Sequence, residues 1–269
     1  MPQPDPLTDF TTFEFAHAGE TRTVYRKGRG PAVVVMHEIP GLTPTVSGFC
    51  RIVADAGFTV FAPLMFGTPG KPASFVYALG QMARACISRE FAVLRRNGSS
   101  PITDWMRALA RHAHGEVGGK GVGAVGMCLT GNFALALVVE PCLKAPVLSQ
   151  PSLPFPVSDS HRRALHISSA ALATLKRRAV EEGLCVLGMR FTRDGTSPPE
   201  RFETLHRELG EAFEGIEIPS DSVPRSHRAW SAITGPHCVL TEDLIDEEGH
   251  PTVAARDRVI AFLRERLAG

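Results

Sequence analysis

From Pro31 onward, apolar runs of strand length alternate with amphipathic segments of helical length. The runs that we expect to form strands span residues 32–38, 58–66, 121–127, 145–150, 184–191 and 215–219. Near-continuous apolar strands separated by helices are typical of a parallel sheet that is covered on both faces. The pattern therefore predicts an α/β fold with a mostly parallel central sheet flanked by helices.

Six segments have the periodicity of helices that can cover such a sheet. They span residues 46–57, about 103–113, 131–140, about 168–183, about 198–213 and about 251–267. Before them, Phe10–Phe15 and Arg22–Arg26 alternate apolar and polar residues around Gly19. This alternation predicts an N-terminal edge hairpin.

The composition is that of one globular domain, since 43% of the 269 residues are hydrophobic and 21% are charged. No linker separates two complete patterns, so we expect a single α/β domain over residues 1–269. Residues of about 67–100 and 219–236 contain clusters of Gly, Pro and Ser. We expect these two segments to be excursions near the pocket.

Charge and hydropathy argue against several classes of partner. The 29 Lys and Arg residues are interspersed with 28 Asp and Glu residues, which leaves no basic surface for nucleic acid or an anionic membrane. The longest apolar runs fall far short of the roughly 18 residues of a membrane span, and Met1–Asp9 has no features of a secretory signal. We expect a cytoplasmic monomer or homodimer that acts on a small molecule.

The six cysteines are scattered along the chain without a CxxC pair or another metal-ligand spacing. In a reducing compartment this distribution predicts free thiols and no metal site. It leaves open that one thiol is reactive.

The most informative motif is Gly126-Met127-Cys128-Leu129-Thr130-Gly131, which lies between an apolar strand and a helical segment. It is a thiol version of the nucleophile elbow, a tight strand-to-helix turn that requires small neighbours. The helix N-terminus that follows favours a thiolate. The alternative is a buried structural cysteine beside packing glycines. Because the chain has no G-x-S-x-G, a hydrolase with this fold would use Cys128 as its nucleophile.

A hydrolase elbow is followed along the chain by an acid and then a histidine, each on a loop after a strand. Asp194 comes directly after the strand expected at 184–191, and Asp243 and Asp246 are the next candidates. For the histidine, we favour His237, which follows a Gly-Pro turn. His250 is the alternative, although its position before Pro251 is also that of a helix N-terminal residue.

The sequence resembles the dienelactone hydrolases, carboxymethylenebutenolidase-like α/β-hydrolases, over roughly residues 31–265. Gly126, Cys128 and Gly131 match the G-x-C-x-G-G elbow of that family. His37-Glu38-Ile39-Pro40-Gly41 is similar to its Q-E-I-F-G-like motif, and His237-Cys238-Val239 is similar to its H-S-F-like motif.

This resemblance implies an α/β-hydrolase that cleaves small carboxylic esters or lactones through a thioester, without a cofactor. Cys128 would attack the carbonyl carbon, and His237, oriented by Asp194, would transfer the protons. The backbone N–H groups of Ile39 and Leu129 would form the oxyanion hole.

The resemblance also implies that Glu38 is a second acidic residue, which lies near the resting thiol and helps to deprotonate it. The alternative is a buried glutamate at the end of a strand that pairs with an arginine. Two other functions stay open for the chain. One is a thioesterase or acyl transferase, and the other is a catalytically silent, ligand-binding relative.

The chain departs from the family's pattern at Thr130 and after His237. Type members of the family bind the substrate carboxylate through arginines, one of them shortly after the histidine, where this chain has Leu240-Thr241-Glu242. This departure argues against a diene-lactone acid as the substrate. The segment at 219–236 is a candidate lid or dimer contact, with Arg225, Arg228 or Trp230 at the mouth of the site.

Overall fold

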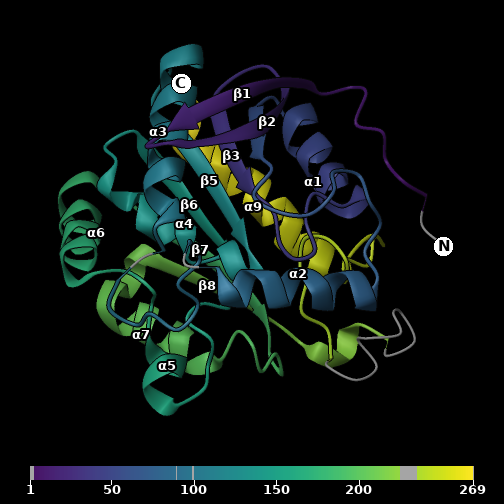
Figure 1. Cartoon of the computed structure of the whole chain (residues 1–269). Coiled ribbons are helices and arrows are strands. Elements are labelled where there is room, and N and C mark those ends of the chain that lie inside the picture. The colour runs from purple at the N-terminus through teal and green to yellow at the C-terminus, as the bar shows by residue number, and fades with distance from the viewer. Residues whose placement is uncertain (1–2, 89, 99, 225–234, 269) are drawn as a thin grey trace.

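The computed structural model describes residues 3–88, 90–98, 100–224 and 235–268 (Figure 1). All strands in these residues belong to one sheet, in the order β1-β2-β4-β3-β5-β6-β7-β8. The strands are β1 (Thr11–His17), β2 (Glu20–Gly28), β3 (Ala32–Met36), β4 (Thr59–Pro63), β5 (Val122–Met127), β6 (Leu143–Ser149), β7 (Val186–Phe191) and β8 (Phe213–Ile218). The pairs β1–β2 and β2–β4 are antiparallel, and all the other pairs are parallel.

This topology confirms the predicted α/β-hydrolase type of fold with its mostly parallel sheet. It also confirms the N-terminal hairpin, since β1 forms one edge of the sheet and pairs only with β2. The strand order places β3 and β6 on either side of β5. Residues that follow these three parallel strands therefore meet at the carboxyl ends of the strands, where ligands bind in open α/β sheets.

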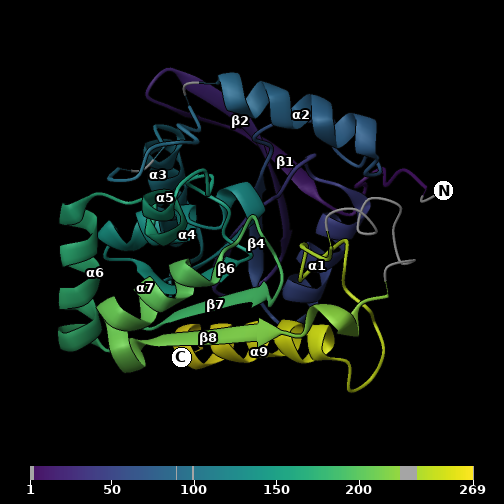
Figure 2. The ribbon, with the colours of Figure 1, turned by 90° about the horizontal axis from the view of Figure 1, so that it is seen from below.

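Helices cover both faces of the sheet, as the apolar strands predict (Figures 1 and 2). In β3, Val33 and Val35 pack toward α1 and α9, whereas Val34 and Met36 pack toward α3 and α4. All five residues of this strand are buried. A strand buried on both faces has no polar alternation, which is why β3 reads as a continuous apolar run.

The helices are α1 (Pro44–Asp55), α2 (Phe75–Ile87), α3 (Ile102–Val117), α4 (Phe133–Ala136), α5 (Asp159–Arg163), α6 (Ser169–Glu182), α7 (Pro199–Leu209) and α9 (Pro251–Leu267). Five of the six predicted helical segments appear with shifts of a few residues at their ends. Helix α2 lies within the segment of about 67–100 that we expect to be an excursion, and the short helix α5 was not predicted. In the described part of the chain, no helix has the length and hydropathy that a bilayer span requires.

The continuous helix predicted over 131–140 is wrong. A 3₁₀ turn at Cys128–Thr130 comes first, then the four-residue α4, then a second 3₁₀ turn at Leu137–Val139. Carbonyl groups in this segment accept hydrogen bonds from arginine side chains. Arg107 donates two hydrogen bonds to Ala136 O, at 2.9 and 2.8 Å. Arg178 likewise donates to the carbonyl of Val138 at 2.7 Å. The irregular backbone is therefore satisfied by side chains from other helices, which the local pattern does not reveal.

His37 connects the carboxyl ends of β3 and β4. Its Nε2 accepts the backbone N–H of Met65 at 3.0 Å, and its Nδ1 donates to Glu38 O at 3.1 Å. Because a backbone N–H can only donate, Nε2 must carry a lone pair, and the imidazole is neutral. Burial opposes the charged form and lowers the pKa of His37 to about 4.

We expect His37 to make the fold sensitive to acid. An unfolded histidine has a pKa of about 6.5, so this contribution is complete above that pH and is lost as the pH falls toward 4. Between pH 7 and pH 5 the loss amounts to about 2 kcal/mol of unfolding free energy. The free energy of unfolding, measured with urea at pH 7 and at pH 5, should differ less between the two pH values for His37→Gln than for the wild type. Glutamine keeps a hydrogen-bond acceptor but does not titrate. The exposed control His112→Gln should keep the wild-type difference, and an equal pH dependence in all three proteins would contradict the assignment.

Candidate functional site

Cys128 lies at the carboxyl end of β5, in a turn that few residues other than glycine can adopt. Its φ is 54°, in the left-handed region, and the residue is 8% exposed. Two glycines permit the turn. A Cβ at Gly126 would lie 2.3 Å from the carbonyl oxygen of Thr130, and one at Gly131 would lie 2.6 Å from Cα of Pro151. This geometry is that of a nucleophile elbow.

Thr130, which departs from the family's elbow pattern, connects the turn to β3. Its hydroxyl accepts the backbone N–H of Met127 at 2.9 Å and donates to the carbonyl of Met36 at 2.9 Å. Thr130 is fully buried. The hydroxyl therefore holds the elbow against the neighbouring strand, a contact that a glycine at this position cannot make.

His237 and Asp194 form a close pair beside the elbow, although they come from different loops. Nδ1 of His237 donates to Oδ2 of Asp194 at 2.6 Å. Oδ1 of the same carboxylate accepts both the backbone N–H and the hydroxyl of Thr196, at 2.9 and 2.8 Å. The side chain of Cys128 also acts on this imidazole, as one of the groups that raise the pKa of His237. Because Nδ1 is engaged with Asp194, the nitrogen left for the thiol is Nε2.

The charges of this group favour an imidazolium beside a carboxylate. Burial disfavours the charged form of His237, but the negative charges of Asp194 and Cys128 outweigh burial and raise the pKa of His237 well above its usual value. Burial likewise disfavours the Asp194 carboxylate, yet His237 and the Thr196 hydrogen bonds lower the pKa of Asp194. Each partner thus stabilises the charged form of the other.

Glu38 is buried directly after β3, and its hydrogen bonds go to uncharged groups. Oε1 accepts the Thr241 hydroxyl, and Oε2 accepts the Gln150 amide at 2.8 Å. The Cys238 thiol also hydrogen-bonds this carboxylate. Burial raises the pKa of Glu38, and the Thr241 hydrogen bond only partly offsets that effect. These contacts place Glu38 against the loop that carries His237, and its predicted part in deprotonating Cys128 stays a prediction.

Asp243 holds the start of the same loop. One of its oxygens, Oδ2, accepts the backbone N–H groups of His237 and Cys238 at 2.8 and 2.9 Å. Asp243, an alternative candidate for the catalytic acid, thus contacts the backbone of His237, whereas Asp194 contacts the imidazole. Burial, together with the charges of Glu38 and Asp243, raises the pKa of Cys238 well above its usual value, so this second thiol stays protonated.

The two predicted oxyanion donors lie on adjacent segments. Leu129 is in the first turn of the 3₁₀ segment, where N–H groups have no partner within the helix. Ile39 follows β3, the strand that pairs with β5. Among the described residues, the N–H of Ile39 donates no backbone hydrogen bond.

Sequence reasoning missed Ser152, whose hydroxyl donates to Sγ of Cys128 at 3.7 Å. It also missed Arg201 of α7, whose guanidinium donates to four carbonyl oxygens in the segment between β6 and α6, those of Pro151, Pro154, His161 and Ala164. The available signal was position, because Ser152 follows a strand adjacent to the elbow strand. The sequence does not show that the loop folds back onto Cys128.

The other predicted residues lie elsewhere. His250 is the N-cap of α9, where its Nδ1 accepts the Thr252 N–H at 3.2 Å and its Nε2 contacts the Ser222 carbonyl at 3.0 Å. Asp246 forms an ion pair with Arg256. Arg225, Arg228 and Trp230 lie outside the described residues.

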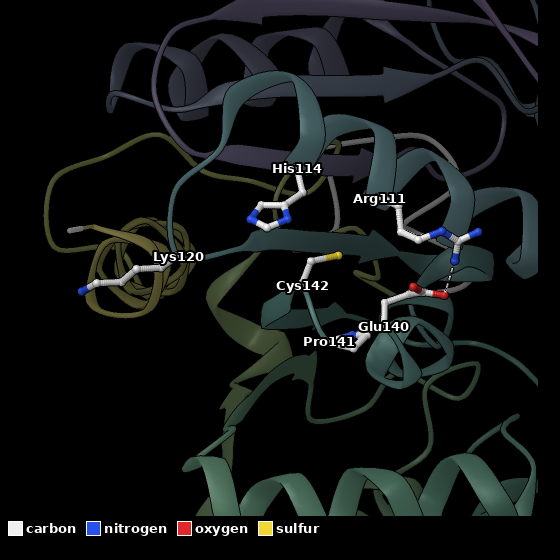
Figure 3. A pocket seen from close by; sticks show the side chains of 6 residues that line it. All are labelled: Arg111, His114, Lys120, Glu140, Pro141 and Cys142. Atoms are coloured by element: carbon white, nitrogen blue, oxygen red, sulfur yellow. Dashed lines mark hydrogen bonds and ion pairs between the residues drawn. The ribbon is translucent and has the colours of Figure 1, made fainter.

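A separate hollow of about 350 Å³ lies at the opposite edge of the sheet (Figure 3). It is lined by Arg111, His114, Lys120, Glu140, Pro141 and Cys142. Lys120 precedes β5 and Cys142 precedes β6, whereas Cys128 follows β5, so the hollow is distant from the elbow. No cluster of three or more His, Cys, Asp or Glu side chains suited to a metal ion occurs in the part of the chain that the structure describes.

A sequence model of the dienelactone hydrolase family matches residues 19–175, more than half of the chain and including the elbow. No curated protein sequence matches the chain.

Solved structures share the fold at low sequence identity. A putative dienelactone hydrolase from Klebsiella pneumoniae is 18% identical, with a TM-score of 0.60 over 95% of this chain and 99% of that one. A dienelactone hydrolase-like promiscuous phosphotriesterase from metagenomic libraries is 15% identical, with a TM-score of 0.60 over 96% and 98%. A dienelactone hydrolase from Anabaena variabilis is 12% identical, with a TM-score of 0.58 over 99% and 100%.

The two histidines should respond differently to substitution. His250→Ala removes an N-cap and should lower the free energy of unfolding by about 1 kcal/mol, without loss of activity toward an activated ester. His237→Ala should abolish that activity, because it removes the residue that we expect to act as the base. Measuring urea unfolding and nitrophenyl ester hydrolysis for both variants distinguishes them, and the reverse outcome would transfer the role of base to His250.

Proposed function

We propose that this chain, which belongs to the dienelactone hydrolase family, hydrolyses uncharged carboxylic esters or lactones through a thioester on Cys128. The observation that carries the proposal is the arrangement at the elbow. Cys128 occupies a positive-φ turn after β5 and interacts electrostatically with His237, which in turn contacts Asp194 at 2.6 Å. A nucleophile, a base and a group that orients the base are the parts that acyl transfer requires.

In the acylation step, Sγ of Cys128 adds to the carbonyl carbon of the substrate, and the thiol proton resides on His237. The negative charge that develops on the carbonyl oxygen is stabilised by the N–H groups of Ile39 and Leu129. When the tetrahedral intermediate collapses, the carbon–oxygen bond of the ester breaks and His237 gives its proton to the leaving alkoxide. The products are an alcohol, or the opened hydroxyl end of a lactone, and a thioester.

In the deacylation step, His237 takes a proton from water while the water oxygen attacks the thioester carbonyl. The same N–H groups hold the second oxyanion. The carbon–sulfur bond then breaks, the electron pair returns to Sγ, and the carboxylic acid leaves. Asp194 keeps Nδ1 protonated in both steps, so that Nε2 faces the reacting atoms.

Apolar surroundings and buried acids support an uncharged substrate. Cys128 belongs to the same buried apolar cluster as Ile39, Phe91 and Phe133. The positions at which type members of the family carry a carboxylate-binding arginine hold Leu240-Thr241-Glu242, all buried. Glu242 and Asp243 are two buried acidic side chains in this region, and acidic surroundings repel a substrate carboxylate.

The nucleophile is tested by substitution of single cysteines. Cys128→Ala should lower kcat for p-nitrophenyl butyrate by at least about 10³-fold, since the other members of such a group contribute little without the nucleophile. Cys128→Ser should also be strongly impaired, because a hydroxyl is far less acidic than a thiol. Acid quenching during turnover should trap a butyryl group on the Cys128 peptide of the wild-type protein, detectable by mass spectrometry.

The control for this test is Cys142→Ala, which removes a half-buried thiol at the opposite edge of the sheet and should keep the wild-type rate. Near-wild-type hydrolysis by folded Cys128→Ala, or a trapped acyl group on another residue, would refute the assignment of Cys128.

Substrate charge gives a further prediction. We expect kcat/KM for neutral p-nitrophenyl butyrate to exceed that for p-nitrophenyl hemisuccinate, which carries a carboxylate, by at least about tenfold, or about 1.4 kcal/mol. Because salt screens repulsion between charges, raising the ionic strength should narrow the difference. A preference for the hemisuccinate would show that cationic residues line the site.

A further inference from the structure

The hydroxyl of Ser152 lies against the sulfur of Cys128. Ser152 is three residues beyond the end of β6, next to β5 in the sheet, and it is 2% exposed. Its Oγ donates to Sγ at 3.7 Å, an ordinary distance for a hydrogen bond to sulfur. His237, from the loop before α9, is a second polar side chain that interacts with Cys128, so the sulfur has neighbours from two separate loops.

The backbone that leads into Ser152 is fixed to the elbow. The N–H of Ser152 donates to the carbonyl of Cys128 at 3.0 Å. Arg201 donates to the Pro151 carbonyl at 2.6 Å, and Cα of Pro151 packs so closely on Gly131 that no Cβ fits between them. Fixed in this way, the hydroxyl has little freedom other than rotation about its own side-chain bonds.

Rotation offers the hydroxyl a second acceptor, the carbonyl oxygen of Gln150 at 3.1 Å. One proton cannot serve both acceptors equally, so the charge on sulfur decides between them. A thiolate is a charged acceptor and attracts the proton strongly, whereas a thiol or thioester sulfur is a weak acceptor and leaves it to Gln150. The hydroxyl is therefore placed to respond to the charge of the sulfur.

We propose that Ser152 is a further catalytic residue, whose hydroxyl stabilises the thiolate of Cys128 before acylation and when the thiolate leaves in deacylation. This inference rests on the proposed function for its catalytic consequence. During acylation, negative charge moves from sulfur to the carbonyl oxygen, and the hydroxyl turns to Gln150. When the carbon–sulfur bond breaks, the electron pair returns to Sγ and the hydroxyl donates to it again. No covalent bond to Ser152 forms or breaks.

The test follows the alkylation of Cys128 by iodoacetamide between pH 5 and pH 10, with peptide mass spectrometry to separate the thiols. Ser152→Ala should move the pH of half-maximal alkylation rate at Cys128 upward by about one unit, because a donor to the charged form is lost. The exposed Cys86 in the same molecules is the internal reference, and its profile should not move. Ser152→Thr keeps a hydroxyl and should return the midpoint toward the wild-type value.

The matched control is Ser197→Ala. The Ser197 side chain is also fully buried, and among the described residues its hydroxyl has no hydrogen-bond partner. This variant should keep the wild-type midpoint at Cys128. Ser152→Gly removes the same hydroxyl as Ser152→Ala and should give the same shift, so that one poorly folded variant does not decide the result.

The outcomes separate this inference from the proposed function. An unchanged midpoint in folded Ser152→Ala and Ser152→Gly overturns the inference, even if Cys128 is required for ester hydrolysis. A shifted midpoint in a protein that hydrolyses no ester supports the contact between Ser152 and the thiolate and refutes the proposed hydrolysis. If both the proposed function and this inference hold, Ser152→Ala should lower the rate of thioester breakdown about tenfold. The amount of trapped butyryl-Cys128 at steady state should then increase.

Discussion

The left-handed backbone at Cys128 is the constraint on which the rest of the site depends. A residue with a side chain costs about 1–3 kcal/mol in such a conformation, so the surrounding structure must hold it there. Thr130 holds the turn to β3, and the N–H of Ser152 holds the carbonyl of Cys128 itself. The strained turn lifts the thiol off the end of β5, toward the loops that carry His237 and Ser152. A relaxed backbone at this residue would point the sulfur elsewhere and leave both donors without a partner.

Much of the fold could be predicted because the strands are buried on both faces. Runs such as Ala32–Met36 have no polar interruption, and their length and spacing distinguish them from the amphipathic helices between them. Asp194 and His237 could be proposed from chain order alone, since each follows a segment that ends at the same edge of the sheet. The structure brings them within hydrogen-bond distance.

The features that could not be predicted depend on contacts between distant segments. The helix expected at 131–140 is broken because Arg107 and Arg178, from α3 and α6, take its carbonyl groups. The partners of Glu38 come from residues 150 and 241, more than a hundred positions away along the chain. Periodicity describes how a segment faces the core, but it carries no information about which side chain reaches a given carbonyl or carboxylate.

Glu38 shows how the chain holds a buried acid against the loop that carries His237 without an arginine. Its hydrogen bonds come from the Gln150 amide and the Thr241 and Cys238 side chains, none of them a cation. Burial without a positive partner favours the protonated carboxyl, in accordance with the raised pKa of this residue. The positive charge of His237 is therefore left mainly to Asp194, whose pKa is lowered. The surroundings thus favour the protonated form of Glu38 and the ionised form of Asp194, although both residues lie at the same end of the sheet.

The position of Arg201 also has a consequence for the order in which the chain folds during synthesis. The guanidinium of Arg201 donates hydrogen bonds to carbonyl oxygens of the segment after β6, which lies about forty to fifty residues earlier in the chain. Ribosomes release a chain from its N-terminus, so Cys128 and Ser152 emerge well before the helix that fixes the loop. A nascent chain that ends near residue 190 already contains the proposed nucleophile, Cys128, but it lacks Arg201 and the proposed acid and base, Asp194 and His237. The proposed catalytic group can therefore assemble only when the last third of the protein has been made, when folding is nearly complete.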